Sequence, residues 1–404
     1  MSQSVSILGG HQTDFANNLA KSGGSVESLV SDAVLATVAD AQIDLADIDT
    51  IHVGNAFGQL YTGQGHLGAM PATVVPELWG IPSMRHEAAC ASSSMATLSA
   101  MAEIEAGRYD CVLVLGVEQE KTMPGPEAAA VQEAAAWVGA DTEGATYIWP
   151  ETFDRLADEY DRRYGLDNIH LRAIGELNLR NAKANPNAQT RGWELSADTC
   201  SDNDDVNPVV AGRLRRNDIT QITDGAAALI LVSDRWLAER GRTPKARIAG
   251  WGHQTVGLGL QQKLDRNSDS TYVMPHVREA ITGAFGRAGI DGVDQLDAIE
   301  THDCMTPSEY MAIDHFGITA PGESWKAVEA GELERDGRIP VNPSGGLIGG
   351  GHPVGATGAR MLLDATKQVA GEAGDYQVED AERVATLNIG GSTATTACFV
   401  VEGV

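Results

Sequence analysis

Two long segments of this 404-residue chain show the same order of hydrophobic and polar positions. In residues 33–53 and again in residues 280–301, apolar positions at helical spacing lead through an Ile-Asp turn into a short apolar strand. Residues 224–234 and residues 391–402 form a second pair, in which a turn of small residues precedes an apolar strand. Because both pairs occur in the same order, the pattern predicts an α/β fold with two duplicated halves.

The stretch between the two halves has a different pattern. Residues 120–215 carry Trp, Asn, Arg and Pro with few buried-strand patterns, and residues 152–186 predict helices that end at Pro186. We therefore expect an inserted region of helices and loops, which on a rigid α/β core commonly shapes a binding site. The predicted domains are an N-terminal half (1–119 with 216–243), an inserted loop domain (120–215) and a C-terminal half (244–404).

Composition adds information about the surface and the solvent. Hydrophobic residues make up 43% of the chain and aromatic residues only 5%, which favours close-packed layers built with small side chains. The 56 acidic residues outnumber the 29 basic ones, of which seven are lysine, and the net charge is -27. Such a surface is typical of a halophile's cytosol, where salt screens self-repulsion, and an ordinary acidic enzyme is the alternative. Either way, the charge disfavours binding to nucleic acid or to an anionic membrane.

Cysteine usage and the lack of long apolar runs indicate the compartment. The five cysteines are Cys90, Cys111, Cys200, Cys304 and Cys398. They are odd in number and scattered, with no CxxC pair, so neither a disulfide framework nor a zinc site is expected. No signal-like segment precedes the first strand pattern, and no apolar run has the length of a membrane span. We expect a cytoplasmic protein.

Two glycine-rich stretches contain the strongest turn signals. Residues 342–358, NPSGGLIGGGHPVGATG, run from a glycine loop into a helix, and residues 386–395, TLNIGGSTAT, are a strand followed by a tight turn. Neither contains the GK[ST] signature of a P-loop, and the first does not fit the GxGxxG pattern of dinucleotide-binding proteins. Nucleotide binding of these two kinds is therefore disfavoured.

Cys90 is the first candidate for chemistry. It lies in EAACASSS, residues 87–94, just before a segment with apolar residues at helical spacing. A cysteine at a helix start is exposed to the positive end of the helix dipole, which lowers the thiol pKa, and the backbone N–H groups there can bind an oxyanion. The alternative is a packed and unreactive cysteine, which is the commoner state of a single cysteine.

Two histidine-containing turns offer partners for this cysteine. His352 follows three glycines just before a helix, where it could take a proton from a thiol or be a structural loop histidine. The sequence THDCMTPSE places His302 and Cys304 at the end of an apolar strand, where α/β proteins gather active-site residues. A thiol with an adjacent histidine could supply an acid/base and an oxyanion donor. A metal-binding turn is the weaker alternative, since no further Cys or His spacing supports it.

The four motifs CASSS, HDCM, GGGHPVGATG and NIGGS, in this order and at these separations, resemble those of thiolases, in particular the archaeal and sterol-carrier-protein types. The resemblance runs across nearly the whole chain. It implies a five-layered αβαβα fold of two duplicated halves with an inserted loop domain, in agreement with the repeated pattern. It also implies acyl-CoA substrates, no metal and no prosthetic group. Together with the acidic composition, it indicates a haloarchaeal protein.

The resemblance also implies roles for individual residues. Cys90 matches the nucleophile that becomes acylated, and His352 matches the base that activates it. Many thiolases carry a second acid/base cysteine in a CxG motif, but Asn388 stands at that position here, so the role passes to Cys304 of HDCM. His302 then replaces the usual asparagine that holds the thioester oxygen.

The remaining motif residues complete the expected site. Gly390 and the backbone N–H of Cys90 match a second oxyanion hole, and Asn388 is a further candidate for oxyanion or substrate binding. Met305 replaces the phenylalanine usual in this motif, which affects local packing. Cys398 lies in a core-strand pattern and is expected to be structural. Contacts to coenzyme A are expected in the inserted region.

These expectations describe an acetyl-CoA C-acyltransferase. It would join two acetyl-CoA into acetoacetyl-CoA and CoA through an acyl-cysteine, or act as a 3-ketoacyl-CoA thiolase in fatty-acid degradation or polyhydroxyalkanoate synthesis. The resemblance implies a homodimer or tetramer, a separate small OB-fold and zinc-ribbon subunit, and HMG-CoA synthase acting on the product. A non-catalytic scaffold subunit and a decarboxylating condensing enzyme are the alternatives, and retention of the catalytic residue types, Cys304 included, disfavours both.

Overall fold

Nine strands of the chain form one continuous mixed sheet. The computed structural model describes residues 4–404. The strands are β1 (Val5–Gln12), β2 (Thr50–Gly54), β3 (Ser83–His86), β4 (Cys111–Glu118), β7 (Gly225–Ser233), β8 (Ala246–Thr255), β9 (Ala298–Thr301), β10 (Arg383–Gly390) and β11 (Thr395–Glu402). Their order along the sheet is β3-β2-β4-β7-β1-β8-β11-β10-β9, and the short strands β5 (Val209–Ala211) and β6 (Leu214–Arg215) pair separately.

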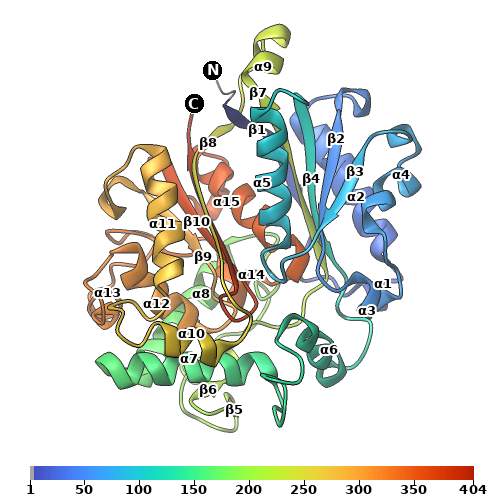
Figure 1. The fold of residues 1–404 in the computed structure, drawn as a ribbon. Coiled ribbons are helices and arrows are strands. Elements are labelled where there is room, and N and C mark those ends of the chain that lie inside the picture. Colours follow the sequence, from blue (N-terminus) through green and yellow to red (C-terminus); the bar gives the residue numbers. More distant parts are fainter. Residues whose placement is uncertain (1–3) are drawn as a thin grey trace.

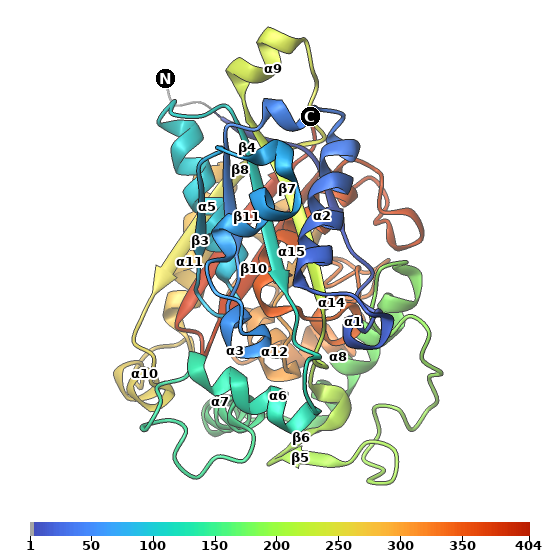
Figure 2. The same cartoon turned by 90° about the vertical axis from the view of Figure 1, so that its right-hand side faces the viewer.

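Helices lie on the outer faces of this sheet and between its two halves. They are α1 (Leu19–Ser22), α2 (Val26–Ala41), α3 (Gly58–Thr62), α4 (Met70–Val74), α5 (Ser92–Glu105), α6 (Gly125–Val131), α7 (Ile148–Tyr164), α8 (Asn168–Asn181), α9 (Asp234–Arg240), α10 (Leu260–Arg266), α11 (Pro275–Ala288), α12 (Thr306–Phe316), α13 (Ser324–Glu329), α14 (Gly346–Gly350) and α15 (Thr357–Val369). α2 packs against β1, β7 and β4, and α11 packs against β8 and β11. α5 and α15 pack against each other between the halves (Figures 1 and 2). The five-layered αβαβα order is confirmed.

The two halves of the sheet repeat one arrangement. In the first half β2 and β4 are parallel, and β7 runs antiparallel to both β4 and β1. In the second half β9 and β10 are parallel, and β11 runs antiparallel to both β10 and β8. The helices correspond as well, because α2 and α11 follow β1 and β8, and α5 and α15 precede β4 and β10. The duplication predicted from the repeated hydrophobic pattern is confirmed.

The central layer is tight because its residues are small. A Cβ at Gly54 on β2 would lie 2.4 Å from the Cα of Ser93 on α5. A Cβ at Gly116 on β4 would lie 2.6 Å from the Cα of Ala356, just before α15. Ala96 of α5 is fully buried. Only small side chains permit so close an approach of α5 and α15 to these strands.

The inserted region lies at one end of the sheet, below it in Figure 1. The helices predicted across residues 152–186 are present as α7 and α8. α7 and α8 both contact α12 of the second half, and α8 also contacts α14. The inserted region therefore faces the turns that follow β9 and β10. The exact limits of the three domains stay a prediction.

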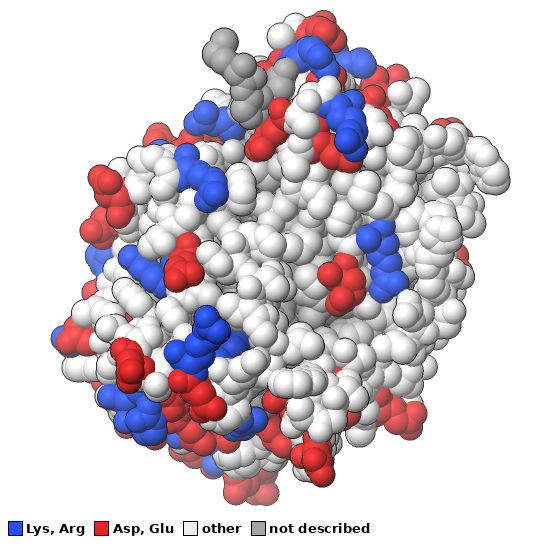
Figure 3. All heavy atoms as spheres, viewed as in Figure 1, with Lys and Arg blue, Asp and Glu red and all other residues white. Residues whose placement is uncertain are grey.

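Charged groups are unevenly spread over the surface. On the face seen in Figure 3, they gather mainly near the upper, left and lower margins, and a broad central area holds few of them. Within residues 4–404, no helix combines the length and the apolar character needed to cross a membrane.

Candidate active site

Four turns meet near the C-terminal ends of β3, β9 and β10. They are residues 87–91 before α5, residues 302–305 after β9, residues 351–353 between α14 and α15, and residues 391–394 between β10 and β11. Each turn contributes a residue to the lining of one cavity: Cys90, Cys304, His352 and Gly391. This location agrees with the tendency of α/β proteins to place active sites beyond the carboxyl ends of strands.

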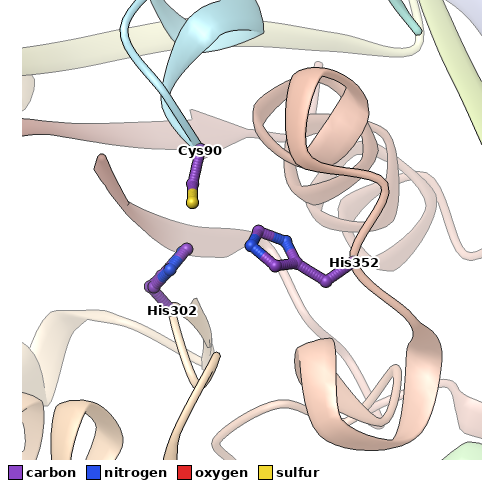
Figure 4. Close-up of side chains that lie close together, drawn as sticks. All are labelled: Cys90, His302 and His352. Atoms are coloured by element: carbon purple, nitrogen blue, oxygen red, sulfur yellow. The ribbon is translucent and has the colours of Figure 1, made fainter. Parts of the chain in front are cut away.

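The turn that carries Cys90 is strained and tightly hydrogen-bonded. Ala89 has φ 49°, a left-handed conformation that costs a non-glycine residue about 1–2 kcal/mol. Ser92 Oγ accepts from the Ala88 N–H at 3.0 Å and donates to the Ala89 carbonyl at 2.6 Å. These bonds hold the turn against the start of α5. As a result the Cys90 side chain points toward two histidines (Figure 4).

His352 is held by a glycine turn and by two threonines. Gly351 has φ 108°, and a Cβ there would lie 3.1 Å from Thr223. The His352 backbone N–H donates to Thr223 Oγ1 at 2.9 Å. On the ring, Nδ1 lies 2.7 Å from Thr357 Oγ1, and this hydroxyl donates to the Pro353 carbonyl at 3.0 Å. Both the backbone and the ring of His352 are therefore fixed.

His302 lies directly after β9 and is buried beside His352. The ring centroids are 5.3 Å apart and the ring planes are nearly perpendicular, at 82°. His302 Nδ1 lies 3.2 Å from Nδ2 of Asn388 on β10. Ser94 Oγ in turn donates to Asn388 Oδ1 at 2.8 Å. The Asn388 amide thus connects His302 to the central helix α5.

One thiol and two imidazoles come together in this site. A liganding atom from each of Cys90, His302 and His352 lies within 4.8 Å of the other two (Figure 4). This cluster places a thiol beside two possible bases, and it would also admit a thiophilic cation. Thr357 and Asn388 occupy the two Nδ1 atoms, so the Nε2 atoms, which have no partner among the described residues, remain for chemistry. The expectation of a metal-free site stays a prediction.

The cavity beside Cys90 has a volume of about 500 Å³. Its base contains Cys90, Cys304 and His352. Its wall includes large apolar side chains, several from the inserted region: Ile148, Trp149, Phe153, Val209, Val210 and Ile219. An apolar cavity with a few convergent polar groups is typical of a site for a small organic ligand.

Burial shifts the Cys90 thiol away from ionisation. It raises the pKa of Cys90 to about 12, although the N–H of Gly391 and the residue's own N–H donate to the sulfur and oppose the shift. The expectation of a pKa lowered by the helix start is therefore wrong. Desolvation is the largest effect, and the nearby carboxyl of Glu120 adds to it.

The other reactive groups are also held neutral. Burial, with the Arg360 cation as the second cause, lowers the pKa of His352 to about 3. Burial and then the neighbouring His352 lower the pKa of His302 well below its usual range. Burial raises the pKa of Cys304 well above that of a free thiol. Near neutral pH the site therefore holds two thiols and two uncharged imidazoles, so a thiolate forms only when a base takes its proton.

The structure brings most of the predicted residues together. Cys90, His302 and His352 are neighbours, and Cys304 lines the same cavity. Asn388, His302 and Gly390 are not among the described residues that line the cavity, and Asn388 contacts the His302 ring. Its expected role in oxyanion or substrate binding stays a prediction.

Gly390, which the sequence paired with the Cys90 N–H as an oxyanion hole, is followed by a second glycine that contacts Cys90, and the oxyanion role of Gly390 stays a prediction. A Cβ at Gly390 would lie 2.2 Å from the carbonyl oxygen of Ala88, so Gly390 allows β10 to pack against the Cys90 turn. The N–H that reaches the Cys90 sulfur belongs to Gly391. The GG pair of the NIGGS motif was the available signal for this second glycine.

Three further residues of the site were missed. Thr357 belongs to the quoted GATG segment, but only the fold shows that its hydroxyl meets His352. Ser94 belongs to CASSS, and its partner Asn388 is 294 residues away. Glu120 lines the cavity and accepts the Val354 N–H at 2.7 Å, and no sequence signal marked it.

Comparisons with known proteins place the chain in a family. It matches the model described as thiolase, N-terminal domain, over residues 5–192 and the model described as thiolase C-terminal domain-like over residues 260–403. It is 32% identical over 397 residues to an acetyl-CoA acetyltransferase of Methanothermobacter thermautotrophicus, with 98% of each chain covered. It is 28% identical over 380 residues to sterol carrier protein 2 of Bos taurus, with 90% of this chain and 66% of that protein covered.

A solved structure shares the fold of this chain. An Ltp2-ChsH2(DUF35) aldolase matches with a TM-score of 0.76 at 20% identity and covers 99% of this chain and 98% of that one. The chain therefore belongs to the thiolase family. It is an acyltransferase enzyme with the thiolase fold, and the resemblance drawn from its motifs is confirmed, whereas a haloarchaeal origin stays a prediction.

Proposed function

We propose that this thiolase joins two acetyl-CoA into acetoacetyl-CoA and free CoA, reversibly, through an acyl-cysteine at Cys90. The observation that carries the proposal is the cluster of Cys90, His302 and His352 within 4.8 Å, at the base of an apolar cavity that Cys304 also lines. The archaeal relative named acetyl-CoA acetyltransferase, similar over 98% of both chains, supports the same substrate.

The first half-reaction uses Cys90 and His352. His352 Nε2 takes the Sγ proton while the sulfur attacks the thioester carbonyl of acetyl-CoA. The bond from the carbonyl carbon to the CoA sulfur breaks, and the leaving thiolate takes the proton from His352. The N–H groups of Cys90 and Gly391 donate to the oxyanion of the tetrahedral intermediate. The product is acetyl-Cys90 with both histidines neutral again.

The second half-reaction forms the carbon–carbon bond. His352 takes the proton of Cys304, and the Cys304 thiolate removes an α-proton from the second acetyl-CoA. His302 donates to the thioester oxygen, which carries the enolate charge. The enolate carbon attacks the carbonyl of acetyl-Cys90, the carbon–sulfur bond breaks, and the Cys90 sulfur recovers its proton from His352. These steps use no metal and no prosthetic group.

Two surface features support a homodimer or tetramer. β3 lies at one end of the sheet, and its outer edge has no strand partner among the described residues. Met84 on β3 and Trp79 just before it are exposed, and the broad area of low charge in Figure 3 offers a further face. Exposed strand edges and apolar patches are commonly covered by another subunit. Light scattering of the purified protein measures the state directly.

Two further proposals concern a partner subunit and the salt content of the surroundings. A solved structure of the same fold is named Ltp2-ChsH2(DUF35) aldolase, and this double name is consistent with a separate partner subunit, for which we propose a small OB-fold and zinc-ribbon protein. HMG-CoA synthase would consume the acetoacetyl-CoA. The net charge of -27 supports work in a salt-rich cytoplasm, and activity is then expected to rise with KCl concentration as salt screens the charge repulsion.

Two assays separate the half-reactions. Exchange of labelled CoA into acetyl-CoA reports acylation of Cys90, and formation of acetoacetyl-CoA reports condensation. We expect Cys90→Ala to lose both activities and Cys304→Ala to keep exchange and lose condensation. Cys200→Ala, a buried cysteine outside the cavity lining, is the matched control and is expected to keep both. Full activity of Cys90→Ala defeats the nucleophile assignment, and full condensation by Cys304→Ala defeats only the acid/base assignment. A wild-type protein that shows neither activity supports the scaffold alternative.

The apolar cavity wall favours a second candidate. Trp149 and Phe153 stand beside a cavity of about 500 Å³, which suits the acyl chain of a longer 3-ketoacyl-CoA, as in fatty-acid degradation or polyhydroxyalkanoate synthesis. Thiolysis rates with C4, C5 and longer 3-ketoacyl-CoA distinguish the two. A kcat/KM that increases with chain length supports this candidate, and one that is highest for C4 supports acetoacetyl-CoA.

A further inference from the structure

The two histidines of the site hold their Nδ1 atoms against partners of opposite hydrogen-bonding character. Nδ1 of His352 lies 2.7 Å from the hydroxyl oxygen of Thr357. Nδ1 of His302 lies 3.2 Å from the amide nitrogen of Asn388. A neutral imidazole carries a single N–H, so the partner at Nδ1 decides whether Nε2 is a donor or an acceptor.

Thr357 selects the tautomer of His352 in which Nε2 accepts a hydrogen bond. The hydroxyl hydrogen of Thr357 is used on the Pro353 carbonyl, 3.0 Å away. Its oxygen lone pairs are therefore available to accept from the ring, and the hydrogen of His352 lies on Nδ1. The Nε2 lone pair is then free, as a base requires.

Asn388 selects the tautomer of His302 in which Nε2 donates a hydrogen bond. Ser94 donates to Asn388 Oδ1 at 2.8 Å, which orients the amide so that its NH₂ group meets the ring. An amide NH₂ only donates, so Nδ1 of His302 accepts and the ring hydrogen lies on Nε2. Both Ser94 and Asn388 are buried, so water does not compete for these bonds.

We propose that Asn388 is a positioning residue that keeps His302 in its Nε2–H form, so that this ring donates to the thioester oxygen of the second substrate while His352 acts as the base. The inference rests on the proposed function. Two neighbouring neutral imidazoles thus acquire different tasks from the groups behind them. Asn388 itself touches no substrate and acts through His302.

Several ionisable groups surround His302 and belong to four elements. They are Cys90 before α5, Asp303 and Cys304 after β9, His352 before α15, and Arg360 on α15. A test of the proposal must therefore change Asn388 while leaving all of these groups in place, and read the result against the wild-type pH profile.

Asn388→Asp changes the amide to a carboxylate of the same size. The carboxylate accepts from Nδ1–H and raises the pKa of His302 above its wild-type value. Below the new pKa the imidazolium still donates from Nε2. Above it, the neutral ring keeps its hydrogen on Nδ1, and Nε2 no longer donates. We expect the ratio of variant to wild-type condensation rates to fall about tenfold per pH unit above the new pKa.

Two controls isolate this effect. Acylation of Cys90 does not use His302, so the ratio of variant to wild-type CoA exchange is expected to stay constant with pH. Asn185→Asp is the matched control, since Asn185 is buried and its side chain bonds only to the Ser344 carbonyl at 3.0 Å and the Asn187 N–H at 3.0 Å. Its ratios for exchange and condensation are both expected to stay constant with pH.

A pH-independent loss of condensation in Asn388→Asp overturns the proposal, because a merely structural role lowers the rate equally at every pH. An equal alkaline loss of exchange and condensation overturns it as well. If Asn388→Asp does not fold, Ser94→Ala is the second variant, because it removes the hydrogen bond that orients the Asn388 amide. It is expected to lower the condensation rate several-fold without changing the exchange rate. A wild-type condensation rate in Ser94→Ala overturns the proposal. Failure of the proposed function itself is seen separately, as a lack of exchange in the wild-type enzyme.

Discussion

Replacing Thr357 by valine is expected to slow acylation of Cys90, because it removes the group that holds His352 as a base. Thr357 Oγ1 lies 2.7 Å from His352 Nδ1, and both residues are buried. Valine keeps the shape of threonine and leaves the ring N–H without a partner. A buried donor without a partner costs about 1–3 kcal/mol. That cost corresponds to an acylation rate about 5- to 150-fold lower.

The assay is exchange of labelled CoA into acetyl-CoA, and Thr366→Val is the matched control. Thr366 is buried on the same helix, α15, and its Oγ1 donates to the Leu362 carbonyl at 2.7 Å. Thr357 makes the same kind of bond, to the carbonyl four residues earlier, at 3.0 Å. Thr366→Val therefore loses an equivalent bond without a contact to His352, and its exchange rate is expected to match that of the wild type.

Two results would refute the reasoning. A wild-type exchange rate in Thr357→Val would show that the hydroxyl does not fix the His352 ring. Equal losses in Thr357→Val and Thr366→Val would show that valine acts through the helix rather than through the ring. A loss in kcat confined to Thr357→Val, with KM unchanged, is the outcome that the geometry requires.

Two further predictions concern pH and stability. The pKa of His352 is lowered to about 3, so the base stays neutral over the usual pH range. The rate of CoA exchange is therefore expected to be constant from about pH 8 down to about pH 5 and to fall only below that. An inflection near the ordinary histidine pKa would contradict this. Arg360→Met is expected to lower the free energy of unfolding by about 3–5 kcal/mol near neutral pH, since the buried guanidinium lies 3.2 Å from Glu300 and 3.1 Å from Asp364. Burial raises the pKa of Glu300 to about 7, and without the Arg360 cation this pKa lies higher still. The loss is therefore expected to be largest at alkaline pH and smaller below that value, where Glu300 is protonated in both proteins; urea unfolding at two pH values measures it, and an equal loss at both would contradict the argument.

The fold could be predicted because duplication leaves a repeated local pattern. Residues 33–53 and 280–301 form most of α2 with β2 and most of α11 with β9, and the apolar spacing that predicts such elements is a property of neighbouring residues. The joining of the two halves into one sheet was not predictable. It depends on two residue pairs between β1 and β8, whose positions follow from the packing of the halves and leave no periodic signal.

The site could be predicted only as far as its motifs extend. Cys90, His302 and His352 stand in short segments whose residue types and spacing indicate the reaction. The direction of the Cys90 pKa shift was missed, because burial is created by walls that the inserted region supplies after folding. The support of His302 by Asn388 and Ser94 was also missed. These two supporting residues are 294 positions apart, so only the folded chain brings them together.

The duplication explains why the thiol and its base meet. Cys90 lies in the turn just before α5, and His352 lies in the turn just before α15, which is the equivalent helix of the other half. Since α5 and α15 pack against each other in the central layer, the two turns come together at one end. His302 follows β9 as Asn55 follows β2, but Asn55 donates to Glu118 and the Val117 carbonyl and serves the frame of the fold. Equivalent positions therefore carry different chemistry, and neither half alone could form the site, because each supplies only one of the two groups that exchange the proton.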